Sequence, residues 1–114
     1  MLLTREAILA AGATLPRETV AVPEWGGEVI VATMTGAARD EWEQSIVTNG
    51  RKVENVRAKL VAATVIDEEG RRLFSADDVQ ALGSLSSAAL DRVCKVAQRL
   101  NGLTAEELES AKGN

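Results

Sequence analysis

The sequence has 114 residues, which suits one domain with a core of its own. Its formal net charge of −4 and its pI near 4.9 oppose binding to a polyanion unless the positive charges cluster. Aromatic residues make up only 3% of the chain, so platforms for stacking nucleic-acid bases are scarce. These totals argue against a nucleic-acid partner and predict a core built from aliphatic side chains.

The residues that usually carry catalysis are missing or have simpler roles. Histidine is absent and Cys94 is the one cysteine, which excludes a Ser-His-Asp or Cys-His site and leaves no zinc ligand set. The carboxylates fall mostly where they serve as first-turn charges of helices, and no phosphate-binding glycine motif occurs. We therefore expect no enzyme activity, no cofactor and no metal. Cys94 is expected to be buried as a small apolar side chain.

The N-terminal segment predicts a short helix from Thr4 to Ala11 that ends at Gly12. Its apolar residues Leu3, Ile8 and Leu9 are too few to stabilise a helix on their own. Charged residues interrupt the run, so it does not have the pattern of a signal peptide. No stretch reaches the roughly 18 apolar residues that span a bilayer. A reducing cytoplasm without membrane contact is the expected location.

A β-hairpin is predicted next. Residues 18–22 form its first strand, which Pro23 ends because it has no N–H to donate. Gly26 and Gly27 permit a tight turn. The return strand, residues 28–34, is apolar on both faces, so we expect helices on one face and a partner chain or a further strand on the other. Trp25 at the tip either folds back onto the core or is displayed to a partner.

The rest of the chain reads as helices with recognisable ends. They are expected at 35–49, 53–66, 75–83, 86–100 and 104–109, the second being the central helix. Trp42 is at a core position, whereas Arg57 is either solvated or paired with an early acidic residue such as Asp40. Residues 67–70 form a turn, and 64–67 with 72–74 can form a very small hairpin. The expected fold class is α+β, mainly α: an N-terminal hairpin packed with four to five short helices.

We expect a single domain over residues 1–109 and a flexible C-terminal tail over 110–114. One pattern within it imitates a DNA-binding motif, since residues 76–99 read as helix, turn and helix. Asp91 near the expected groove-facing surface and the net charge of the chain count against that function. A helix-turn-helix regulator nevertheless remains an alternative.

Three runs of the sequence resemble the tail assembly chaperone family of long-tailed siphoviruses. They are VPEWGGEVIVATMTGAARDEWEQS, NVRAKLVAATVIDEEGRRLFSADDVQAL and RLNGL. Their order and spacing, over about residues 5 to 108, carry the resemblance. Ala38 departs from the pattern, since a charged residue is usual there.

The resemblance implies a non-enzymatic assembly chaperone acting in the host bacterial cytoplasm and absent from the mature virion. Its implied partners are the tape measure protein, which it keeps soluble, and tail tube subunits, which it helps to recruit. It also implies a longer form made by frameshifting, of which this chain is the short form, and association with that form.

Apolar residues of the hairpin and of the 86–100 helix are the predicted partner-binding set. An open hairpin edge favours self-association, and apolar helix faces suit a helical client. On this hypothesis a charge at Ile30 abolishes oligomers. The predicted residues are Trp25, Val29, Ile30, Val31, Met34, Leu90 and Val93.

Overall fold

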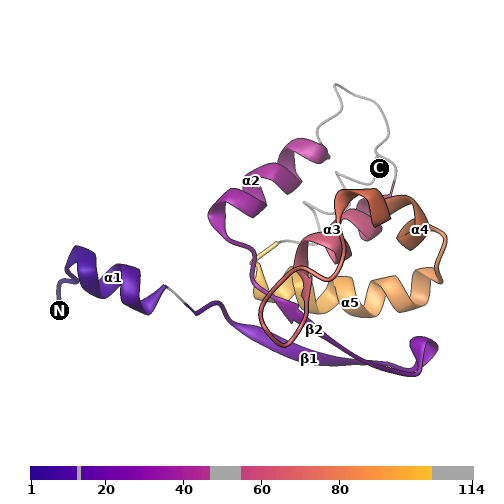
Figure 1. Cartoon of the computed structure of the whole chain (residues 1–114), viewed down its shortest axis with the longest axis horizontal. Helices are drawn as coiled ribbons and strands as arrows, with labels where there is room; N and C mark the ends of the chain where they lie inside the picture. Colours follow the sequence, from indigo (N-terminus) through magenta and orange to yellow (C-terminus); the bar gives the residue numbers. More distant parts are fainter. Residues whose placement is uncertain (13, 47–54, 104–114) are drawn as a thin grey trace.

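The computed structural model describes residues 1–12, 14–46 and 55–103, and its elements are labelled in Figure 1. The fold is α+β and mainly α, as the sequence predicts. In chain order the elements are α1 (Arg5–Ala11), β1 (Arg17–Val22), the 3-10 turn η1 (Pro23–Trp25), β2 (Gly27–Ala32), α2 (Gly36–Ser45), α3 (Val56–Thr64), β3 (Val65–Ile66), the 3-10 turn η2 (Ala76–Asp78), α4 (Val79–Gly83) and α5 (Ser87–Leu100).

The sheet has three antiparallel strands in the order β1-β2-β3. The hairpin between β1 and β2 turns through η1, and Gly26 accepts the left-handed conformation there with φ 74°. Val20 pairs with Val29, and Val31 pairs with Val65, so these side chains share one face. That face carries the buried valines of the sheet and is the one turned to the core.

Helices α3 and α5 build the core with this face. Helix α3 is buried on most of its circumference, from Val56 to Thr64, as expected for the central helix. Helix α5 is amphipathic, and it packs on β1, on β2 and on α3. Its buried side includes Leu90, Val93 and Cys94, so the predicted burial of the cysteine is confirmed.

The outer face of the sheet is only partly covered. Ala32 and Ile66 on this face are buried, and Ile30 is half-buried. Thr19 and Ala21, towards the hairpin tip, are exposed. The third strand extends the sheet at its β2 edge instead of covering a face. Both faces of the return strand are thus at least partly covered, as predicted, and the exposed part of the outer face belongs mainly to β1.

The end of α5 is tied to the β2–α2 connection by Asn101. Its Oδ1 accepts a hydrogen bond of 2.7 Å from the backbone N–H of Met34, and its Nδ2 donates to the Ala97 carbonyl at 2.8 Å. Its own carbonyl accepts from Arg39 at 2.7 Å. Gly102, with φ 66°, then lets the Leu103 N–H reach back to the Gln98 carbonyl, which is the hydrogen bond of a Schellman cap.

The predicted small hairpin after α3 is present. Ile66 and Arg72 form an antiparallel bridge, and the Leu73 N–H donates to the Val65 carbonyl at 3.0 Å. Gly70 supports the turn between them with φ 87°.

Ion pairs join α5 to the rest of the fold. Arg92 pairs with Glu24 of η1 at 2.9 Å, and Arg99 pairs with Glu18 of β1 at 2.7 Å. Arg57 pairs with Asp91 of α5 at 2.6 Å. The expectation of an early acidic partner such as Asp40 is therefore wrong, because α3 packs against α5 and brings Arg57 to the polar side of that helix.

Two predicted helices are shorter in the structure. Helix α2 ends at Ser45, before the predicted end at 49, and α3 runs from Val56 to Thr64, inside the predicted 53–66. Val65 and Ile66 belong to β3 instead. The 104–109 helix and the division between the domain and the tail at 109/110 lie outside the described residues. The predicted caps within the described part are present: Thr4, Thr35, Ser75 and Ser86 each accept a hydrogen bond from a backbone N–H of the helical turn that follows.

The Schellman cap gives a first test. Gly102→Ala is expected to lower the free energy of unfolding by about 1 kcal/mol, because alanine resists the positive φ. A β-carbon at Gly102 meets no atom within 4 Å, so the cost is conformational and not steric. Urea denaturation followed by circular dichroism measures it. Gly36→Ala is the matched control: it also meets open space but has no positive φ, so stability should stay level or rise. An equal loss in both variants contradicts this account.

The ion pair at the hairpin tip gives a second test. The backbone N–H of Glu24 first, and then Arg92, hold the pKa of the Glu24 carboxyl below its ordinary value of 4.5. A carboxyl with a lowered pKa stabilises the fold above its ordinary pKa and loses that contribution as the pH falls through the lowered value. Arg92→Ala should raise the pKa of Glu24, as followed by the side-chain carboxyl ¹³C shift during a pH titration. Arg99→Ala, on the same helix, should leave it unchanged; a matching shift in both variants refutes the pairing.

Candidate functional site

Two hollow features of the described surface lie beside α2 and α3. One cavity of about 390 Å³ is bounded by α2, α3, η2 and α4. A second, of about 410 Å³, is bounded by the segment before β1, the β2–α2 connection and the turn after β3. The two share the residues Ala38, Ala63 and Arg72, so we treat them as one feature and call it the α2–α3 groove.

Small side chains leave this groove open. Ala38 on α2 faces Ala62 and Ala63 on α3, and Val79 of α4 adds an aliphatic wall. Charged side chains of both signs stand at the rim: Glu41, Lys59, Arg72 and Asp77. An apolar floor with a polar rim is the usual character of a site that binds a peptide or protein segment.

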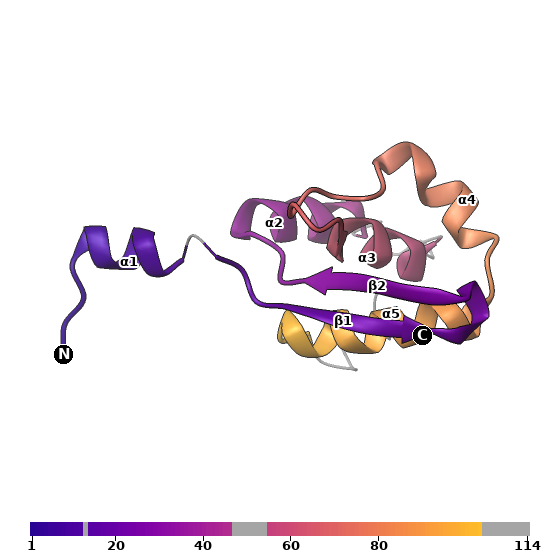
Figure 2. The ribbon, with the colours of Figure 1, turned by 60° about the horizontal axis from the view of Figure 1, so that its bottom comes forward.

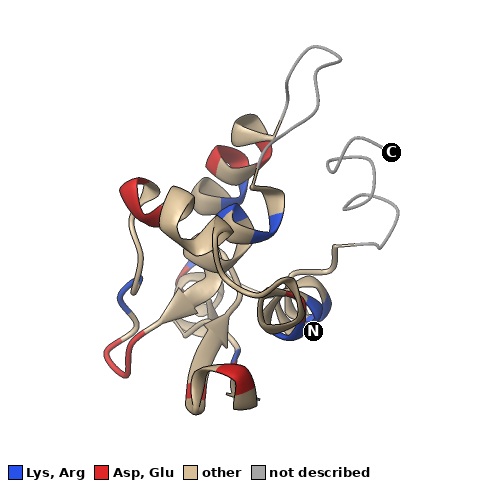
Figure 3. Ribbon diagram, turned by 90° about the vertical axis from the view of Figure 1, so that its right-hand side faces the viewer, with Lys and Arg blue, Asp and Glu red and all other residues tan. Residues whose placement is uncertain are grey.

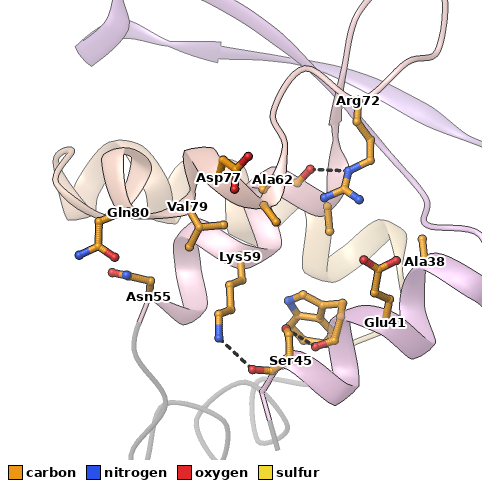
Figure 4. Close-up of a pocket in the computed structure, with 13 residues that line it drawn as sticks. Ala38, Glu41, Ser45, Asn55, Lys59, Ala62, Arg72, Asp77, Val79 and Gln80 are labelled. Atoms are coloured by element: carbon orange, nitrogen blue, oxygen red, sulfur yellow. Dashed lines mark hydrogen bonds between the residues drawn. The ribbon is translucent and has the colours of Figure 1, made fainter.

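The groove is lined by three cations, Arg17, Lys59 and Arg72, and backbone carbonyls fix the last two. Lys59 donates to the Ser45 carbonyl at 2.8 Å and so holds the last turn of α2. Arg72 donates through Nε to the Ala62 carbonyl at 3.0 Å. Figure 4 shows both contacts, with the Lys59 side chain crossing from α3 to α2. These cations therefore shape the walls of the groove.

Trp42 is the one buried residue of α2, with 5% of its surface exposed, and it lines the groove. Its burial was predicted from the helical spacing. Its Nε1 is buried without a hydrogen-bond acceptor, and it is the only such side-chain atom among the described residues. A buried donor without an acceptor costs about 1–3 kcal/mol, a cost that the packing of the Trp42 ring must offset.

The predicted partner-binding residues are divided between core and surface. Val31, Met34, Leu90 and Val93 are buried against their own chain, each less than 9% exposed. In this fold they contact the core, which corrects their assignment as a free surface. Their apolar character reflects packing of the sheet against α5.

The other three predicted residues belong to the hairpin. Trp25, Val29 and Ile30 are half-buried. Trp25 and Val29 pack against the edge of the core, so Trp25 lies back against the body and retains a partly exposed surface. Ile30 is on the outer face of the sheet, the face to which Ala32 and Ile66 also belong. Ile30 is therefore an apolar residue of the outer face beside Ala32 and Ile66, which line the groove, whereas Val29 shares the core-facing side with Val20. We call the partly exposed Trp25 and Ile30 the hairpin surface.

The N-terminal residues form a second exposed apolar surface. Helix α1 buries none of its residues, and it stands clear of the body in both Figure 1 and Figure 2. Of the seven large hydrophobic residues exposed in the described part of the chain, five are Met1, Leu2, Leu3, Ile8 and Leu9. We call residues 1–11 the N-terminal arm.

The structure argues against the helix-turn-helix alternative. Helix α5, which would enter the groove of DNA, is packed on the sheet and on α3. Its cations Arg92 and Arg99 are paired with carboxylates of the hairpin. Figure 3 shows basic and acidic residues interspersed over the described elements, without a basic face. A duplex would meet neutralised arginines and nearby carboxylates.

The described residues hold no group of three or more Cys, Asp or Glu side chains placed to bind a metal ion. None of their helices has the length and hydropathy needed to cross a membrane.

The sequence did not reveal the groove. Its floor comes from Ala38 and Ala63, and small residues in helices give no signal of a cavity until the helices are packed. Trp42 was recognised as a core residue, but its missing acceptor became visible only in three dimensions. The one available hint was Ala38, the position at which the chain departs from the pattern it resembles.

Comparison with known proteins places this geometry in context. The family model described as phage tail assembly chaperone matches residues 3–112. A solved structure, the tail assembly chaperone of bacteriophage HK97, aligns with a TM-score of 0.59 at 22% sequence identity, covering 86% of this chain and 95% of that one. It shares the fold. No curated protein sequence matches the chain.

The family match extends over nearly the whole chain, from the N-terminal arm past the end of the described residues, and it agrees with the resemblance found in the sequence. The chain belongs to the phage tail assembly chaperone family.

Proposed function

We propose that this chaperone binds the tape measure protein of its phage, keeps it soluble and helps to bring tail tube subunits onto it. The single observation that carries the proposal is the family match over residues 3–112. The proposed role involves no catalysis and no cofactor. It is exercised in the cytoplasm of the bacterial host before the tail is complete, so the chaperone is not retained in the virion.

The surface of the fold is compatible with a long apolar client. Such a client, largely helical, aggregates alone because it exposes hydrophobic surface. The chaperone offers partly exposed Trp25 and Ile30 on the hairpin, while its net charge of −4 keeps a complex soluble. Since Leu90 and Val93 are buried, we assign the client to the hairpin surface instead of to helix faces.

Two further parts of the proposal concern partners. A longer frameshifted form would carry the same domain and extend beyond residue 114, so it would share the hairpin surface and associate with the short form. Tube subunits would then be gathered near the client by that extension. A structural tail or neck protein is the rival that remains, and it predicts the chain in purified particles.

Co-expression with the tape measure protein of the same phage is the direct test. Most of the tape measure protein should be insoluble alone and should move to the soluble fraction, several-fold enriched, when the chaperone is present. The two should co-purify through a tag on either one. A tape measure protein that stays insoluble, or a chaperone found in finished particles, contradicts the proposal.

The client surface is tested by adding one charge to it. Ile30→Glu should reduce the soluble fraction of the co-expressed tape measure protein several-fold, because a carboxylate on the outer face of the sheet resists burial under an apolar client. Ala88→Glu adds the same charge to an exposed position of α5 and is the control. Circular dichroism confirms that both variants fold. Equal solubilisation by both variants would remove the hairpin from the client interface.

A further inference from the structure

We propose that the N-terminal arm of one copy docks in the α2–α3 groove of a second copy. The contact is between two different surfaces of the same chain, so it can continue from copy to copy. This contact between copies does not involve the proposed client, because the contact uses the arm and the groove, whereas the client is assigned to the hairpin surface.

The apolar side chains of the arm are exposed to solvent, because the described body of the chain does not pack against them. Leu2 is 97% exposed, and Ile8 and Leu9 are 53% and 58% exposed. Helix α1 has seven residues and buries none of them. A helix this short is marginal in water and gains its stability from packing. Five large aliphatic side chains exposed within nine residues are typical of a segment that binds another surface.

The connection to the body lines one end of the groove, but the arm itself lies outside it. Thr14, Leu15 and Arg17 border the second cavity. Proline favours an extended conformation for Leu15, and the carbonyl of Pro16 accepts a hydrogen bond of 2.9 Å from the Thr33 N–H, which continues the β1–β2 ladder to this point. Helix α1 stands beyond the end of β1, as Figure 2 shows. In this conformation α1 does not fill its own groove, so a second copy can supply the arm that does.

The groove can accommodate the exposed aliphatic side chains of the arm. Its floor of Ala38, Ala63 and Val79 can take aliphatic side chains, and the two cavities of about 390 and 410 Å³ leave room for several of them. Trp42 lines the first of these cavities as well, so docked side chains would contact its indole ring.

The charges are also compatible with this pairing. The arm carries one charge of each sign, Arg5 and Glu6, which lie 3.5 Å apart and are largely exposed. The groove rim has acidic Glu41 and Asp77 as well as basic Lys59 and Arg72. A docked arm therefore finds an opposite charge for each of its own.

The first experiment measures sedimentation velocity of the full chain from micromolar to millimolar concentration. The wild type should sediment faster as its concentration rises. The triple arm variant Leu3→Ser, Ile8→Ser and Leu9→Ser should remain a monomer throughout. The control is Leu73→Ser with Leu85→Ser, which removes the two exposed large aliphatic residues of the described chain outside the arm; it should associate like the wild type. A monomeric wild type, or a control that fails equally, overturns the proposal.

Mixing two defective variants gives a sharper test. Ala38→Arg places a bulky side chain in the groove. The fold should tolerate it, because α2 buries only Trp42. Ala63→Glu is the second choice if that variant does not fold. The groove variant and the arm variant should each be monomeric alone. Their equimolar mixture should form a heterodimer and nothing larger, since only one arm and one groove remain. A mixture that stays monomeric means that the arm binds its own groove or another protein, and the proposal fails.

The indole of Trp42 provides a site-specific signal. In a ¹H–¹⁵N spectrum its Nε1–H signal should shift as the wild-type protein associates, because side chains docked in the groove change the surroundings of the indole ring. Trp25→Phe leaves a single indole signal and so assigns it. Ile30→Glu should not change association; if it abolishes oligomers while the arm variant does not, the hairpin edge is the interface and the arm is not. None of these readouts depends on the client.

Discussion

The hydrogen bonds of Asn101 determine how this molecule is assembled. One side chain, buried at the end of α5, accepts from Met34 and donates to Ala97, while its carbonyl accepts from Arg39. Met34 and Arg39 lie on either side of the start of α2, 62 to 67 residues away in the sequence. The end of the core helix thereby positions α2. Because α2 buries little else than Trp42, the groove between α2 and α3 exists in its present form only while this junction holds.

The core uses nearly all of the aliphatic side chains that helices and strands could otherwise offer to a partner. The valines of β1, β2 and α5 pack against one another. Few large hydrophobic residues therefore stay exposed in the described chain: five are in the arm, and the other two are Leu73 and Leu85. This division matters for an assembly chaperone. Surfaces that bind a client must remain accessible in a folded and soluble protein, and the acidic net charge together with the small size of each patch reconciles these demands.

Local features could be predicted from the sequence and distant ones could not. The caps at Thr35, Ser75 and Ser86, the positive φ at Gly70 and the helical end at Asn101–Gly102 follow from a few neighbouring residues. The partner of Arg57 does not, since it depends on how α3 crosses α5. The stripe that includes Leu90 and Val93 was recognised as apolar, but periodicity cannot tell a buried face from a binding face. The groove required the packing of three elements and had no periodic signal at all.

The proposed arm contact would change what a weak client surface can achieve. A patch the size of the hairpin surface binds an apolar helix only loosely by itself, because association must first overcome the loss of translational and rotational freedom. Copies joined arm to groove would present several hairpins in series to one long client. Each further hairpin then binds at a high effective concentration without any new kind of contact. The same arrangement would disperse as soon as arms and grooves separate, which suits a protein that must hold its client during assembly and leave it afterwards.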